Sequence, residues 1–90
     1  MDRAAFEAAA RADGFDIAER AIEPNRDVGD HTHAFDARLL ILDGEFALTI
    51  AGERRVYGPG DWCDVPSGTV HAEHSGPQGA RVSVGRRQAA

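Results

Sequence analysis

Glycine recurs at eight-residue intervals through the second half of the chain, and this spacing constrains the fold more than any other feature of the sequence. The glycines of this series lie in turn-like surroundings, such as Asp43-Gly44 and Gly58-Pro59-Gly60; they are Gly44, Gly52, Gly60, Gly68 and Gly76. The short apolar segments between them do not resemble one another, so the interval reflects a strand plus its turn rather than a solenoid repeat. Regular turns at this spacing predict an all-β sandwich or barrel.

The apolar residues between these turns follow the two-residue period of β-strands. Phe46, Leu48 and Ile50 alternate with more polar or smaller residues, which predicts one buried face. The run 39–42 is apolar on both faces, so we expect its outer side to be covered as well. An N-terminal helix or a second subunit could provide that cover.

The first residues have a different pattern and predict a helix over residues 2–13. Asp2 can cap its first turn, alanines fill its interior, and Gly14 follows where a C-terminal cap is expected. Phe6 is its only large apolar side chain, so we expect the helix to pack on the sheet. The expected organisation is one domain over residues 1–90, with the barrel at about 15–86 and a frayed tail at 87–90.

Charge and cysteine content exclude several classes of function. Ten basic residues face 15 acidic ones, and a net charge of −5 argues against a nucleic-acid partner. The single cysteine excludes an internal disulfide framework and a zinc site built from cysteines alone. No apolar run approaches the roughly 18 residues of a membrane span, and the charged N-terminus leaves no signal-peptide core. We therefore expect a cytoplasmic protein with no membrane partner.

The four histidines lie in two clusters, and the first cluster is the more informative. On an extended strand His31 and His33 project from the same face, so both imidazoles can reach one metal ion. A polar surface loop is the alternative interpretation of this pair. His71 follows a tight turn, and a closed barrel could bring it to the pair, whereas His74 has the opposite strand parity and is expected to point outward.

These residues resemble the two sequence motifs of the cupin family. The first motif contains a His-x-His pair followed at a fixed distance by glycine, and His31, His33 and Gly44 stand in those places. The second motif is Gly, five residues, Pro-x-Gly, two residues and His; it is matched without a gap by Gly60, Pro66-Ser67-Gly68 and His71. The resemblance implies a cupin (RmlC-like) fold, a double-stranded β-helix or jelly-roll barrel. It also implies one mononuclear divalent metal (Zn, Fe, Ni or Mn) bound by His31, His33 and His71.

Two positions depart from these motifs, since Ala37 stands where the family has a glutamate ligand and Ser75 where it has asparagine. Asp36 has the wrong strand parity to replace that glutamate and is expected to be a surface residue, although a β-bulge could redirect it. Glu73 shares the parity of the third histidine and is the candidate acid or base; a solvated rim residue is the alternative.

Three histidines around a metal with an open position are typical of catalytic rather than structural sites. One hypothesis is therefore a metal-dependent enzyme acting on a small molecule, of dioxygenase or isomerase type. The other is a non-catalytic module that binds or senses a small molecule. The resemblance and the apolar run 39–42 both favour a homodimer. Cys63 is expected to be a buried small hydrophobe, and Trp62 and Tyr57 are expected to fill the core.

Overall fold

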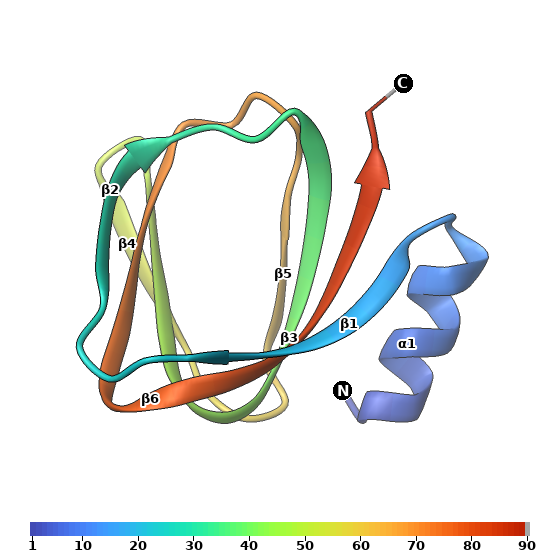
Figure 1. The fold of residues 1–90 in the computed structure, drawn as a ribbon, viewed down its shortest axis with the longest axis horizontal. Coiled ribbons are helices and arrows are strands. Elements are labelled where there is room, and N and C mark those ends of the chain that lie inside the picture. Colours follow the sequence, from blue (N-terminus) through green and yellow to red (C-terminus); the bar gives the residue numbers. More distant parts are fainter. Residues whose placement is uncertain (90) are drawn as a thin grey trace.

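The structure is a computed structural model that describes residues 1–89, and it is built almost entirely from β-strands after one short helix (Figure 1). In chain order the elements are α1 (Arg3–Ala12), β1 (Asp16–Ile22), β2 (Asp27–His31), β3 (Phe35–Ile50), β4 (Glu53–Tyr57), β5 (Trp62–Val65) and β6 (His71–Gln88). No helix among the described residues is long and apolar enough to cross a membrane.

Two long strands, β3 and β6, organise an antiparallel barrel. The sheet order is β1-β6-β3-β4, while β2 pairs with β6 and β5 pairs with β3. Each long strand therefore pairs with the other and with two shorter strands, and β3 and β6 bend over the barrel so that the sheet curves back on itself (Figure 1). The expected all-β barrel with an N-terminal helix is confirmed.

The bend in the long strands depends on glycine. The β3–β6 register shifts on either side of Gly44, which has φ +79°. A Cβ atom at Gly44 would overlap the carbonyl oxygen of Gly79, so no other residue fits this crossing. The predicted turn at Gly44 is therefore wrong, because the residue lies inside β3, and Gly76 likewise lies inside β6. A positive-φ glycine serves a bulge as well as a turn, and the sequence does not distinguish the two.

The barrel interior is filled by side chains that alternate along β3 and β6. Leu39 lies opposite Val84 and Ile41 opposite Val82, and all four belong to the buried core. Cys63 is buried in the same cluster, which confirms its role as a small hydrophobe. Trp62, by contrast, is 43% exposed, so the predicted core-filling role is wrong for that residue.

The outer face of β3 and β6 is covered by α1. Phe6 and Ala10 of the helix are buried, as is Leu40 of β3. Ser83, the register partner of Leu40, donates a hydrogen bond from Oγ to Glu7 Oε2 at 2.6 Å. Of the two covers considered for the run 39–42, the helix is the one present within the chain.

Both ends of the described chain are held to the barrel. Asp2 caps α1 by accepting a hydrogen bond from the Ala5 N–H at 2.9 Å, so the helix begins one residue later than predicted. The sequence predicts a frayed tail from residue 87, but β6 continues through Gln88 in register with β3. Arg87 forms an ion pair with Asp36 at 2.9 Å, which supplies the packing partner that the sequence alone does not reveal.

Candidate metal centre

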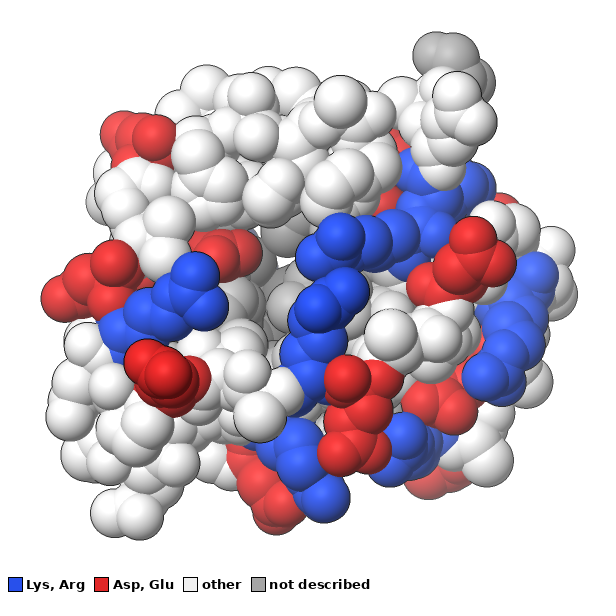
Figure 2. Space-filling view, viewed as in Figure 1, with Lys and Arg blue, Asp and Glu red and all other residues white. Residues whose placement is uncertain are grey.

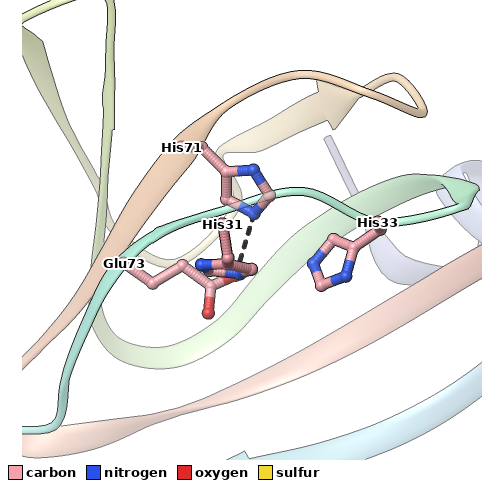
Figure 3. A group of neighbouring side chains, drawn as sticks. All are labelled: His31, His33, His71 and Glu73. Carbon is pink, nitrogen blue, oxygen red and sulfur yellow. Dashed lines mark ion pairs between the residues drawn. The ribbon is translucent and has the colours of Figure 1, made fainter.

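Three histidines and a glutamate converge at one end of the barrel. His31 ends β2, His33 lies in the loop that leads to β3, and His71 and Glu73 lie at the start of β6. β2 pairs with β6 so that His31 and His71 are register partners. Figure 3 shows the four side chains pointing into a common space from these separate segments.

The potential ligand atoms are close enough to share one ion. One such atom from each of the four residues lies within 4.8 Å of all the others. His71 Nε2 lies 3.6 Å from Glu73 Oε1, near the about 3.4 Å that separates donors around a tetrahedral ion with bonds of about 2.1 Å. The cluster therefore needs only small side-chain movements to close around a metal.

Backbone carbonyls fix the orientation of two of the rings. The Nδ1–H of His31 donates to the Gly29 carbonyl at 2.8 Å, and the Nδ1–H of His71 donates to the Thr69 carbonyl at 2.9 Å. A carbonyl can only accept, so these contacts assign the proton to Nδ1 and leave Nε2 as the lone-pair donor. This is the usual outer-shell arrangement of metal-binding histidines.

The clearest sign of a metal site is a buried atom without a partner. His71 is 1% exposed, and its Nε2 atom forms no hydrogen bond with any described residue. Buried polar atoms are rarely left unsatisfied, because each costs about 1–3 kcal/mol. A metal ion among the four donors would satisfy this atom.

Burial and the neighbouring rings favour the neutral form of the third ring. Burial lowers the pKa of His33, and the neighbouring His71 and His31 lower it further. His33 also stacks on Phe35, with ring centroids 4.7 Å apart. A neutral imidazole is the form that binds metals, so the cluster fits a divalent transition ion.

Comparison with known proteins identifies the family of this barrel. The sequence profile described as "Cupin domain" matches residues 18–82, which is most of the chain. The chain belongs to the cupin family. No curated protein matches the sequence.

Many solved structures share this cupin fold. A protein of unknown function from Rhizobium leguminosarum bv. viciae 3841 is 23% identical with a TM-score of 0.77, over 83% of this chain and 71% of the other. A Cupin 2 conserved barrel domain protein from Salinispora arenicola CNS-205 is 22% identical with a TM-score of 0.69, over 83% and 64%. The polyketide cyclase RemF from Streptomyces resistomycificus is 26% identical with a TM-score of 0.66; the match covers 84% of this chain and 58% of RemF.

Within the cupin barrel, Glu73 supplies the carboxylate that is absent at position 37. Ala37 is buried in the core, where it offers no ligand atom. Glu73 shares a face of β6 with His71, as strand parity predicts, and its carboxylate lies in the cluster. The side chain is partly exposed at the pocket and points toward the histidines (Figure 3).

Other polar residues near the site position it without joining the cluster. Asp36 accepts a hydrogen bond from the Ser67 N–H at 2.9 Å, and this bond together with Arg87 lowers its pKa. Ser67 Oγ and Gly68 N–H in turn donate to the His33 carbonyl, at 3.2 and 3.0 Å. Sequence reasoning missed this clamp, which holds the turn before His71 against the His33 loop.

The remaining two candidates lie beside the cluster. His74 pairs with Asp27 through Nδ1 and contributes no atom to the group of four. Ser75 stands at the cupin asparagine position; its Oγ donates to the Glu23 carbonyl and accepts from the Arg26 N–H, the latter at 2.9 Å. Ser75 therefore joins β6 to the segment before β2.

The cluster faces a pocket with a volume of about 610 Å³, which is within the usual range for small-molecule sites. His31, His33 and Glu73 line this pocket, and the core side chains of Leu39, Phe46 and Val84 form its apolar wall. A small molecule entering this pocket would meet the His/Glu cluster directly.

Proposed function

We propose that this cupin is a metal-dependent enzyme acting on a small molecule, with the metal bound by His31, His33 and His71 and with Glu73 as the adjacent carboxylate. The observation that carries the proposal is the buried, unpartnered Nε2 atom of His71 beside three other potential ligands. A core histidine with a purely structural role would be expected to satisfy both ring nitrogens.

The proposed chemistry divides between the metal and the chain. A divalent ion bound here would act as a Lewis acid on water or on a polar group of the substrate. The Gly29 and Thr69 carbonyls hold two rings with Nε2 toward the site. The Glu73 carboxylate is placed to accept a proton at Oε1 from a molecule bound at the cluster, which is the role of a general base.

A non-catalytic module that binds or senses a small molecule is the second candidate, favoured by the alanine at the usual glutamate position. The enzyme is preferred because Glu73 restores a carboxylate to the cluster. RemF, one of the similar structures, is named as a cyclase, so a related barrel supports enzymatic function. The cytoplasmic location, the single-domain extent and the homodimer stay predictions, and light scattering of the purified protein tests the last.

Metal analysis of the purified protein tests the site. The wild type should bind close to one equivalent of Zn, Fe, Ni or Mn after reconstitution, and His71→Ala should bind almost none. His74→Ala is the matched control, because this histidine lies on the same strand, three residues after His71, but outside the cluster. Equal metal content in wild type and His71→Ala would contradict the ligand assignment.

Turnover separates the two functions. The protein loaded with each metal is incubated with a panel of small molecules that bind by NMR, and products are followed by mass spectrometry. An enzyme should convert at least one ligand, and Glu73→Gln should slow that conversion by about 100-fold or more. Ligands that bind but are recovered unchanged with every metal would favour the binding module.

A further inference from the structure

The arginines of this acidic chain are distributed unevenly between ion pairs and the pocket. Within residues 1–89, six of the ten arginines form ion pairs with carboxylates; they are Arg3, Arg11, Arg38, Arg55, Arg81 and Arg87. The other four are Arg20, Arg26, Arg54 and Arg86, and all of these except Arg54 line the pocket that contains the His/Glu cluster. Figure 2 shows basic side chains on both sides of the central hollow.

The acidic side chains of the pocket do not neutralise these arginines. Glu19 is engaged by Arg3 at 3.0 Å and by Arg81 at 3.7 Å. Glu73 lies in the histidine cluster, where its Oε1 atom is 3.6 Å from His71 Nε2, and it forms no ion pair with an arginine among the described residues. The pocket therefore keeps three unpaired guanidinium groups although the chain carries a net charge of −5.

Strand register places two of these arginines on the interior face. Arg20 lies opposite Val82 and Arg86 lies opposite Ala37, and both partners belong to the barrel core. Directly opposed residues in a sheet share a face, so both arginines extend from the face that carries these core side chains, although the arginines themselves are exposed. Asp16 of β1 is the other register partner of Arg86, but among the described residues the two form no ion pair, so the guanidinium stays available to a ligand.

Aromatic stacking connects one arginine to the cluster. The Arg86 guanidinium lies 4.7 Å from the centre of the Phe35 ring, and Phe35 stacks on His33 with centroids 4.7 Å apart. Such a cation–π contact orients the plane of the guanidinium group and leaves the N–H groups at its edge available to a ligand. Arg86 is thus held one ring away from a residue of the cluster.

We propose that the pocket binds an organic carboxylate, with Arg86 holding the anionic group, Arg20 and Arg26 adding positive charge to the pocket lining, and the apolar wall holding the body of the molecule. Guanidinium groups bind carboxylates through paired hydrogen bonds, and a singly charged group is compatible with the nearby Glu73 and the apolar lining. The inference rests on the proposed function, since it names the substrate class of the same site. The end of the molecule opposite the carboxylate would then reach the His/Glu cluster.

The experiment is an NMR titration of the metal-loaded protein with 3-phenylpropionate, 3-phenylpropionamide and inorganic phosphate. The carboxylate should bind and shift backbone signals of residues 20, 26, 35 and 86, and the uncharged amide should bind about tenfold more weakly or worse. Arg86→Gln should weaken carboxylate binding by about tenfold and Arg26→Gln by a smaller factor, with spectra that remain dispersed. Arg54→Gln removes an arginine that has no ion pair among the described residues and lies outside the pocket, so it should leave binding unchanged.

Several results would overturn the inference. They are equal affinity for the carboxylate and the amide, equal affinity in the wild type and both pocket variants, or stronger binding of phosphate than of 3-phenylpropionate. Failure of the carboxylate to bind at up to about 20 mM would also overturn it, because even a fragment held by a guanidinium group and an apolar wall should bind in the millimolar range.

Metal content measured on the same samples separates this inference from the proposed function. A protein that holds metal but does not distinguish carboxylate from amide contradicts the substrate class alone. Carboxylate binding that depends on Arg86 in a protein that holds no metal supports the anion site and contradicts the metal-dependent function.

Discussion

Replacing His71 by leucine tests the metal hypothesis through the sign of a stability change. Leucine is similar in size to histidine and has no polar atom, so it removes the buried Nε2 without creating a large cavity. The effect on the free energy of unfolding should then differ in direction between protein treated with a chelator and protein saturated with metal. A histidine with only a structural role has no reason to show such a reversal.

The expected magnitudes follow from the contacts of His71. With chelator, the substitution relieves a desolvation cost of about 1–3 kcal/mol at Nε2 and loses a hydrogen bond from Nδ1 to the Thr69 carbonyl worth about 1 kcal/mol. The variant should therefore be as stable as the wild type or more stable by up to about 2 kcal/mol. Metal at 100 times its dissociation constant adds about 2.7 kcal/mol to the wild type and nothing to a variant that cannot bind it. The variant should then be the less stable protein by about 1–3 kcal/mol.

Urea unfolding with EDTA and with each of the four candidate metals measures these differences. His74→Leu is the control, because His74 lies outside the cluster and its stability change should be the same in both conditions. A loss of more than about 2 kcal/mol for His71→Leu in EDTA would refute the reasoning and make His71 a structural residue. Failure of every metal to stabilise the wild type would refute the ligand assignment.

Three further predictions concern the scaffold around the site. Leu40→Ala should lower the free energy of unfolding in urea by about 2–5 kcal/mol, because Leu40 is buried beneath α1; a loss below about 1 kcal/mol would contradict that cover. Gly44→Ala should cost more than about 2 kcal/mol in the same assay, because its Cβ would overlap a carbonyl. Gly52→Ala, at a similar φ of +78° but with open space, should cost only about 1 kcal/mol; equal losses would contradict the steric argument. Ser83→Ala should raise the NMR titration midpoint of Glu7 toward 4.5, because the Ser83 hydrogen bond is the main cause of its lowered pKa. Because the pKa of Glu7 is depressed in the folded state, Ser83→Ala should be less stable than the wild type above about pH 4.5, and this difference should disappear as the pH falls through the folded-state pKa. A difference that does not depend on pH would contradict the assignment.

The histidine cluster could be predicted from the sequence because its members stand in recognisable motifs, although barrel pairing over 40 residues is what brings His71 to His31. Two of its members lie two residues apart, and the third directly follows a recognisable turn. Strand parity then sufficed to assign Glu73 to the interior and to exclude Asp36. These inferences required only the direction of side chains along a strand.

Features that depend on contacts between distant segments could not be predicted in this way. The clamp between Asp36 and Ser67 joins residues 31 positions apart, and the ion pair of Arg87 with Asp36 spans 51 positions. The sequence likewise does not show which arginines find a carboxylate, so the three arginines of the pocket that lack an ion pair among the described residues become visible only after folding. For the same reason, the interior position of Gly44 in β3 requires the crossing with Gly79 to be known.

The alanine at position 37 and the unpaired arginine at position 86 are connected by the strand register. Ala37 is the register partner of Arg86, so a glutamate at position 37 would lie beside the guanidinium and would neutralise it. With alanine at 37 and the carboxylate at Glu73, the cluster keeps an acidic group while Arg86 forms no ion pair among the described residues. If the proposed functions hold, a carboxylate on β6 instead of β3 would leave an acidic group beside the metal and a cation for an anionic ligand. On that proposal the alanine at position 37 is tied to what the pocket binds, and the carboxylate-against-amide titration tests it.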